Sequence, residues 1–583
     1  MAALAGTPGA RDVTRAAALR RAAPWTALSI ASVVLFAVSR GKWSDALIDS
    51  GREWIVPDAL ARGELLYRDV VYWFGPFTPY FHSLFFRALG SSFRSLVVAG
   101  IVGAAGVLGC LHFALRQVTG RREAWGWTIL AVPLLVFMPN AGGAILGMGY
   151  RMWHAAGFSL LALALASRPR ISPERGLFLA AGSLAGAAGL CRTEWGVAAA
   201  AALVLVVTRR FRGTRDLRPA LGWIAAGFLA VEITGLGILA ILAGPARVLR
   251  DAPVLLFNLP PETLRRPGGL GAAGWLRGSA QMLYGTLALL GAFLALELLA
   301  ASRRDPARVP SALRRLGLVL LLLGVCFGVG GLPSSAIFSG APLLCALSVW
   351  AGLRTPHQPL GAALAGFGAM GFLASHRRFF FLTDGPYVAP PLLFALVCAA
   401  GCVALAARSR PAPVREGLSP LLLTAFSVFG AAIFIGRCLA YSADDRVPVP
   451  GTEGMLSASP QVVRRIVEVT ARLRSETPPG AGVVVFPEGE ILNYLSGRSN
   501  PIRHKLYLPG YVNSFNEAAI VEELSRASPG ALVIWPRPVG EYGNGFFGRD
   551  YARSLQSWID ANYRPEPNIG RHGPQLLWRA RRD

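Results

Sequence analysis

The chain has 583 residues, of which 53% are hydrophobic and only 16% are charged. Soluble proteins have about 25% charged residues, and a soluble chain of this length divides into several domains that each need a charged surface. The mean hydropathy is +0.45, and the apolar residues come in long runs. The composition therefore excludes a soluble multidomain protein and predicts a protein that contacts membrane lipids.

The formal net charge of +25 comes almost entirely from Arg, because Lys occurs only at Lys42 and Lys505. A strongly basic chain raises the question of nucleic acid binding. Here the Arg residues form short clusters between apolar runs, as basic residues do beside the cytoplasmic ends of transmembrane helices. We therefore expect no nucleic acid partner. The seven Cys have neither disulfide nor metal-site spacing.

About thirteen apolar runs follow one another along the chain, and we interpret each as a transmembrane helix. They cover 22–39, 95–115, 125–139, 152–167, 176–191, 195–208, 220–243, 280–301, 316–332, 334–351, 359–375, 389–407 and 417–436. Several runs are shorter than the roughly 20 residues of a typical span. A different division of 176–208 or 316–351 would change the count. The expected fold class is a polytopic α-helical membrane protein with about 13 transmembrane helices.

Basic residues gather in alternate connections between these runs. The connections are 1–21, 116–124, 168–175, 209–219, 302–315, 352–358 and 408–416, and together they hold 24 Arg against six acids. Short basic connections lie on the cytoplasmic side. We therefore predict a cytoplasmic N-terminal segment, 1–21, and a transmembrane domain, 22–439, in a bacterial inner membrane. An odd number of spans then places residues 440–583, called the tail below, in the periplasm.

The tail is richer in charge, and its short apolar stretches alternate with amphipathic ones. Buried strands are predicted at 483–486, 531–535 and 576–578, and helices at 460–473, 517–527 and 551–562. Residues 455–460 are interpreted as a linker because Gly, Ser and Pro lie close to them. This alternation predicts a small extramembrane α/β domain.

The loop between the first two runs, residues 40–94, combines acids, aromatic residues, Gly and Pro. Its main stretches are Asp49-Ser-Gly-Arg52-Glu53, Ala61-Arg-Gly63-Glu-Leu-Leu-Tyr67-Arg-Asp69 and Tyr72-Trp-Phe-Gly75-Pro-Phe-Thr-Pro79-Tyr80. The acids recur close to the point where the first helix should leave the membrane. The apolar stretch 79–89 is too short to cross the membrane and is expected near its surface.

In order and spacing these stretches resemble the first external loop of GT-C membrane glycosyltransferases. That class includes protein O-mannosyltransferases and aminoarabinose transferases, and the likeness is to its bacterial family 39-like members. The stretch Gly189-Leu-Cys-Arg192-Thr-Glu194-Trp-Gly196 is similar to an Arg-x-Glu-x-Gly turn of the same class. The resemblance implies a GT-C-like fold that contacts membrane lipids. It also implies transfer of a sugar from a polyprenyl-phosphate donor in the membrane to a lipid, glycan or protein acceptor outside it.

The resemblance also implies roles for individual residues. Asp49 would be the general base on the acceptor hydroxyl, a role open to a carboxyl whose pKa is raised near an apolar interface. The supporting acids would be Asp69 and Glu53, and further site residues would be Glu194, Tyr72 and Tyr80. The leaving phosphate needs cations, which Arg supplies through bidentate hydrogen bonds. The candidates on the predicted external side are Arg52, Arg192, Arg377 and Arg378.

Each role has a structural alternative. Asp49 could cap a helix or pair with Arg52, and Asp69 could pair with Arg68 or hold a turn. Arg192 and Glu194 could pair with each other, while Arg377 and Arg378 could anchor an interfacial loop. A divalent ion, Mg or Mn, held by Asp49 and Asp69 is left open. The sequence contains no zinc-site spacing and no P-loop.

Two other functions are left open. A transporter or flippase of lipid-linked sugars also needs many helices, but it should have paired halves with corresponding broken helices, which the sequence does not show. A non-catalytic subunit that keeps the fold is the other alternative. In the glycosyltransferase, the tail is expected to shape the acceptor entrance or to dock a partner.

Overall fold

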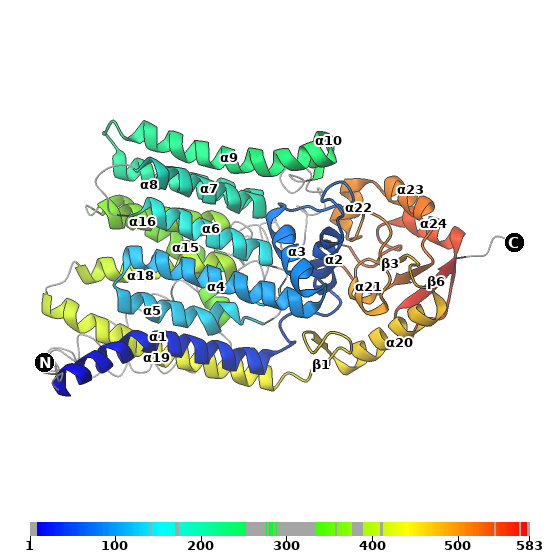
Figure 1. The fold of residues 1–583 in the computed structure, drawn as a ribbon, viewed down its shortest axis with the longest axis horizontal. Helices are drawn as coiled ribbons and strands as arrows, with labels where there is room; N and C mark the ends of the chain where they lie inside the picture. Colours follow the sequence, from blue (N-terminus) through cyan, green and yellow to red (C-terminus); the bar gives the residue numbers. More distant parts are fainter. Residues whose placement is uncertain are drawn as a thin grey trace, which may run out of the picture.

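The computed structural model has long helices at one end, the tail at the other, and two short helices of the first loop between them (Figure 1). It describes residues 8–139, 142–147, 149–168, 174–251, 276, 279–280, 283, 287, 333–355, 358–375, 389–408, 412–540, 544–570 and 573–579. The N-terminus lies at the end of the helices that is remote from the tail (Figure 1).

The apolar runs fold into helices because lipid offers no hydrogen-bond partner to a peptide group. They form α1 (Pro8–Ser39), α4 (Phe93–Val118), α5 (Arg121–Ala131), α6 (Tyr150–Ala166), α7 (Arg175–Cys191), α8 (Thr193–Phe211), α9 (Leu217–Ala243), α15 (Pro333–Arg354), α16 (Gln358–Ala374), α18 (Ala389–Arg408) and α19 (Ala412–Ser442). Within the described ranges, four helices are long and apolar enough to cross a membrane: Ala22–Ser39 of α1, α4, α9 and α18. The predicted spans 280–301 and 316–332 fall almost wholly outside the described residues, so a count of thirteen stays a prediction.

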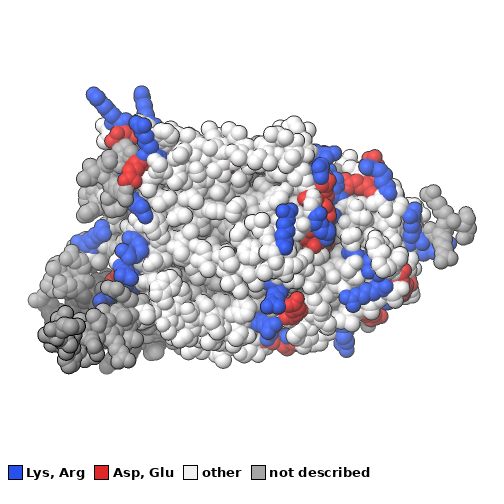
Figure 2. All heavy atoms as spheres, in the orientation of Figure 1, with Lys and Arg blue, Asp and Glu red and all other residues white. Residues whose placement is uncertain are grey.

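The outer helices expose apolar side chains that a soluble protein would bury. Ile233 and Ile241 of α9 are 67% and 85% exposed, and Val33 of α1 is 66% exposed. Figure 2 shows a broad surface without charge over the helices, with Lys, Arg, Asp and Glu gathered at the two ends. Such a surface is stable only in contact with lipid, and the chain is a membrane protein.

Two predicted boundaries can be compared with the structure. The run 125–139 is not a single α-helix, because α5 ends at Ala131 and a π-helical turn, η1 (Val132–Val136), follows. Pro133 lies in this turn, and its carbonyl accepts a hydrogen bond from Arg437 Nε of α19 at 3.1 Å. The division of 176–208 is correct, because Arg192 is extended between α7 and α8.

The first loop folds into α2 (Ser50–Ala61) and α3 (Phe77–Leu89), which lie between the long helices and the tail (Figure 1). Nearly every residue of α2 is buried, although the helix contains Arg52, Glu53 and Asp58. Burying charged residues is costly unless they are paired. The buried position of α2 therefore requires ion pairs for its charged side chains, and the pairs made by Arg52 and Glu53 form part of the candidate site.

The tail contains a four-stranded sheet with strand order β3-β4-β6-β5. Its strands are β3 (Val483–Phe486), β4 (Ala531–Ile534), β5 (Tyr563–Pro565) and β6 (Gln575–Arg579), with β3 parallel to β4 and the other pairs antiparallel. The helices are α20 (Pro460–Glu476), α21 (Ile491–Ser496), α22 (Pro509–Phe515), α23 (Glu517–Ala527) and α24 (Arg553–Asn562). The predicted strands correspond to β3, β4 and β6, and the predicted helices to α20, α23 and α24. The predicted linker instead contains β2 (Ser457–Ala458), which pairs with β1 (Val447–Pro448).

The hydrophobic core of the tail includes two residues of the first loop. Val71 and Trp73 belong to the same buried cluster as Val484 and Leu532 of the sheet. The Trp73 ring stacks on Tyr511 of α22 with the ring centroids 3.5 Å apart. The first loop and the tail therefore share one core, and a site on the loop is also a site on the tail.

Candidate active site between the first loop and the tail

The site is built on the first turn of α2. Asp49 precedes the helix with φ 68°, a left-handed conformation that is uncommon for a residue with a side chain. Its Oδ1 accepts a hydrogen bond from Arg52 Nη2 at 2.6 Å, and Glu53 Oε1 lies 3.7 Å from the same nitrogen. All three residues are buried. The ion pair with Arg52 is therefore present, whereas the Asp49 side chain makes no capping hydrogen bond to the helix.

Arg151, at the start of α6, joins the membrane helices to this cluster. Its Nη1 lies 2.8 Å from Glu53 Oε1 and donates to the Tyr72 hydroxyl at 3.1 Å. Its guanidinium carbon stands 3.9 Å from the centre of the Phe74 ring. A cation stacked on an aromatic ring and paired with a carboxylate is strongly held. Arg151 therefore fixes two predicted site residues, Glu53 and Tyr72.

The turn between α7 and α8 also lies close to Phe74. Arg192 pairs with Glu194, which is the structural role considered for these two residues from the sequence. The guanidinium carbon of Arg192 is 5.2 Å from the centre of the Phe74 ring. Gly75 makes the approach possible, because a Cβ there would stand 2.0 Å from the Leu190 carbonyl oxygen. The structure thus brings Arg192 and Glu194 to the first loop.

The tail closes the site through the turn between β3 and α21. Gly51 of α2 touches this turn so closely that a Cβ on Gly51 would be 2.4 Å from the Ile491 nitrogen. The turn carries Glu488 and Glu490, which are 3% and 1% exposed. Arg537, after β4, lies 2.8 Å from Glu488 Oε1. Two buried carboxyl groups and one Arg of the tail therefore lie next to the first turn of α2.

Burial alters the acidity of these two groups. Burial, followed by the charge of Asp49, raises the pKa of Glu488 to about 8. Burial also raises the pKa of Glu490 to about 7, against the opposing effect of hydrogen bonds from backbone N–H groups. Desolvation disfavours the charged form of a carboxyl group, and a nearby negative charge does the same. Near the start of α2, Glu488 and Glu490 therefore keep their protons at a higher pH than an exposed Glu does.

The sequence did not predict the residues that distant segments bring to the site, namely Arg151, Glu488, Glu490 and Arg537, nor Tyr511, which stacks on Trp73 of the first loop. One signal was available for two of them, because Glu488 and Glu490 directly follow the buried strand at 483–486. Polar residues at the end of a strand often face a site. The other three stand in segments without any local sign of a site.

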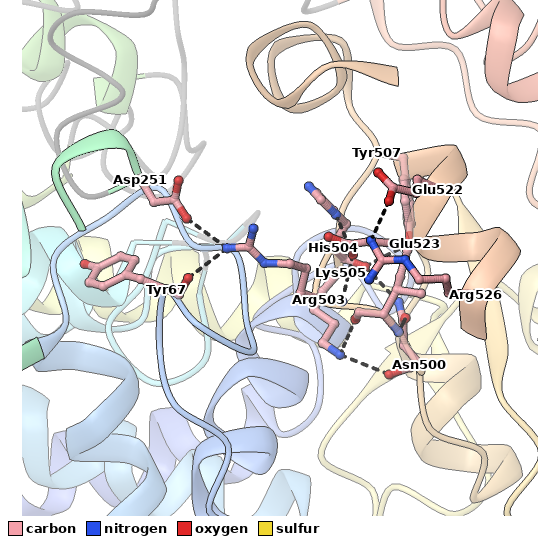
Figure 3. Close-up of polar contacts among 11 residues, drawn as sticks. Tyr67, Asp251, Asn500, Arg503, His504, Lys505, Tyr507, Glu522, Glu523 and Arg526 are labelled. Atoms are coloured by element: carbon pink, nitrogen blue, oxygen red, sulfur yellow. Dashed lines mark hydrogen bonds and ion pairs between the residues drawn. The ribbon is translucent and has the colours of Figure 1, made fainter. Parts of the chain in front are cut away.

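A second junction joins the tail to the first loop and to α10 (Pro245–Asp251), the short helix after α9 (Figure 3). Arg503 Nη2 donates to the Tyr67 carbonyl at 2.7 Å and to Asp251 Oδ2 at 3.2 Å. Asp251 ends α10 and is fully buried. The Arg503 carbonyl in turn accepts from the Val71 backbone N–H at 3.0 Å. One tail residue therefore holds both the first loop and α10.

Replacing Arg503 with Gln should loosen this junction. The change removes a charged hydrogen bond from buried Asp251, which costs about 1.5–3 kcal/mol. We expect a lower thermal midpoint and faster protease cleavage of the purified protein. Arg526→Gln is the matched control, because Arg526 pairs with Glu522 at the exposed surface (Figure 3), and such pairs contribute little. Equal stability of the two variants would contradict this account.

Comparison with known proteins identifies the fold. No protein-family model and no curated protein sequence matches the chain. Solved structures do match it: ArnT from Cupriavidus metallidurans bound to undecaprenyl phosphate has a TM-score of 0.50 and 12% identity, over 96% of this chain and 98% of that one. The apo state of that ArnT has a TM-score of 0.50 and 15% identity over the same shares. The apo oligosaccharyltransferase of Archaeoglobus fulgidus has a TM-score of 0.50 and 14% identity, over 97% of this chain and 75% of that one.

The chain has the GT-C fold. The expectation drawn from the first-loop motifs is thereby confirmed for the architecture. At 12–15% identity the likeness concerns the fold alone, so the reaction, the donor and the acceptor need their own evidence.

Four other residues were predicted for the site: Asp69, Tyr80, Arg377 and Arg378. Asp69 pairs with Arg68 at 2.8 Å and accepts from the Leu65 backbone N–H, as its structural alternative requires. The hydrogen bond from Arg68 lowers the pKa of Asp69. Tyr80 accepts a long, 3.5 Å contact from the Leu66 N–H. Arg377 and Arg378 lie outside the described residues.

A divalent ion shared by Asp49 and Asp69 was left open by the sequence. Asp49 pairs with Arg52, while Asp69 is engaged in the turn 65–69. Among the residues that the structure describes, no group of three or more His, Cys, Asp and Glu forms a metal site. Mg or Mn therefore stays a prediction, and no step proposed below depends on a metal.

Proposed function

We propose that this protein is a glycosyltransferase that moves a sugar from a polyprenyl-phosphate donor to an acceptor at the external face of the membrane. The observation that carries the proposal is the buried Asp49–Arg52 pair, placed where the membrane helices, the first loop and the tail meet. The GT-C fold supports it, since ArnT, a solved protein of that fold, binds undecaprenyl phosphate.

The proposed reaction uses groups within this cluster. The acceptor hydroxyl attacks the anomeric carbon of the sugar and gives its proton to the Asp49 carboxylate. The bond between that carbon and the phosphate oxygen breaks, and the polyprenyl phosphate leaves with the electron pair. Arg52 and Arg192 stabilise the negative charge of the leaving group, with Arg377 and Arg378 as further candidates. Glu53 orients Arg52 and Glu194 orients Arg192, while Tyr72 and Glu53 are held in place by Arg151.

Arg52 has a free hydrogen-bond donor for this role. Its Nε is buried and has no hydrogen-bond partner among the described residues. A buried donor without a partner costs about 1–3 kcal/mol. A donor phosphate oxygen at this position would satisfy it, which favours anion binding beside Asp49.

The proposed orientation places residues 1–21 in the cytoplasm and the tail in the periplasm of a bacterial inner membrane. The charge distribution supports this, because the charged residues at the end of the helices remote from the tail are mainly Arg, whereas the tail end mixes both signs (Figure 2). Basic residues prefer the cytoplasmic side. The tail, from about residue 440, then lies on the same side as Asp49.

A transfer assay tests the proposal. Wild-type protein in lipid nanodiscs is incubated with a panel of polyprenyl-phosphate sugars and with lipid, glycan and peptide acceptors, and sugar transfer is measured. The proposal predicts transfer from at least one donor of the panel. In proteoliposomes, movement of intact donor across the bilayer without any transfer would instead identify a flippase.

A further inference from the structure

The turn 487–490 of the tail is shaped to place acids against α2. Gly489 has φ 138°, a conformation that only glycine adopts readily. Across from it, a Cβ on Gly51 would lie 2.8 Å from the Glu490 carbonyl carbon. Two glycines therefore allow the turn and the helix to touch through their backbones, and this contact fixes where Glu488 lies.

Glu488 is held from both sides. On the tail side, Arg537 Nη1 lies 2.8 Å from its Oε1. On the α2 side, it lies close enough to Asp49 and Arg52 for their charges to interact with it, and Glu490 of its own turn does the same. The Glu488 side chain is only 2% exposed. The ion pair with Arg537 and these charge interactions place a second carboxyl group near the proposed base.

We propose that Glu488 is a positioning residue of the site: it keeps a proton beside Asp49 while the anionic donor binds, and its loss of that proton makes the donor pocket too negative. This inference rests on the proposed function. It gives the tail a defined part in donor binding, whereas the sequence suggested only acceptor entry or docking of a partner.

The physical reason is that neighbouring buried carboxyl groups do not readily ionise together. Asp49 and Glu488 each lie beside an Arg, Arg52 and Arg537 respectively. Burial and the charge of Asp49 outweigh Arg537 and raise the pKa of Glu488 to about 8, so Glu488 is the group that keeps a proton. Arg537 and Arg52 lower this pKa, while burial, Asp49 and Glu490 raise it. Above pH 8, a second negative charge faces Arg52 and repels the phosphodiester of the donor.

The kinetic test compares wild type with Glu488→Gln at pH 7 and pH 9. If only the protonated form binds donor, a pKa of about 8 makes the wild-type KM for the donor about tenfold higher at pH 9. Gln is permanently neutral, so its KM should match wild type at pH 7 and lack this tenfold step; any rise from Glu490, whose pKa lies at about 7, is common to both proteins. Glu566→Gln is the control, because Glu566 is a tail carboxylate paired with Arg472; it should keep the wild-type profile.

The variant Arg537→Gln provides a second kinetic test if Glu488→Gln does not fold. Arg537 lowers the pKa of Glu488, so its removal should move the rise in KM to higher pH. The inference is overturned if Glu488→Gln keeps the rise in KM, or if Arg537→Gln leaves its position unchanged.

Infrared spectroscopy tests the same proton without any transfer. Wild type should lose part of its protonated-carboxyl band near pH 8, and Glu488→Gln should lack that part. An unchanged band in Glu488→Gln contradicts the inference, even in a protein that transfers sugar. Absence of transfer by wild type counts against the proposed function instead.

Discussion

Asn in place of Asp49 should reduce kcat for sugar transfer by about 10²–10⁴-fold, the usual contribution of a general base. Asn has almost the shape of Asp and can still accept a hydrogen bond from Arg52. It cannot take a proton from the acceptor hydroxyl. The donor should bind at least as well as to wild type, because a negative charge beside Arg52 has been removed. Initial rates at saturating donor, together with the donor KM, measure both effects.

Asp45→Asn is the matched control for this variant. Asp45 is exposed, four residues before Asp49, and its Oδ1 accepts from the Leu47 and Ile48 backbone N–H groups. Asn can accept the same bonds, so we expect near wild-type rates. If Asp49→Asn transfers sugar as fast as Asp45→Asn, Asp49 is not the base.

Gly51→Ala should have the largest effect on the structure of the site. In an exposed helix interior, Ala is more stable than Gly by about 1 kcal/mol. Here the added Cβ would meet the Ile491 nitrogen at 2.4 Å and the Glu490 nitrogen at 2.9 Å. These are backbone atoms and cannot rotate away, so the tail must shift from α2. We expect a lower thermal midpoint and at least a tenfold lower transfer rate, since displacements of about 1 Å at reacting groups can cost 10²-fold.

Gly106→Ala is the control, because Gly106 lies within α4 and a Cβ there would have no heavy atom within 4 Å. This variant should be as stable as wild type or more so. A stable, fully active Gly51→Ala protein would contradict the close contact between α2 and the tail.

The parts of the site that sequence could predict are local. Asp49 and Arg52 are one helical turn apart, so helix geometry alone brings them together. The motifs around Tyr72 and Gly75 likewise stand in one continuous loop. The fold class and most helices followed from hydropathy, because a bilayer imposes a long apolar run on every span.

The rest of the site depends on tertiary packing. Arg151 begins a span that looks like an ordinary apolar helix, and only the fold shows it over Phe74. Glu488 stands in an α/β segment without a catalytic motif. Its raised pKa comes from burial and from Asp49, which is more than 400 residues away in the chain. Hydropathy and spacing carry no information about such contacts.

One measurement tests the central claim most directly. The donor identified by the panel is prepared with a radiolabelled sugar and a fluorescent polyprenyl chain, and is given to wild-type protein in nanodiscs. The account predicts that labelled acceptor and free polyprenyl phosphate appear at equal rates, and that both are lost in Asp49→Asn. Release of polyprenyl phosphate without labelled acceptor, or equal transfer by Asp49→Asn, would contradict it.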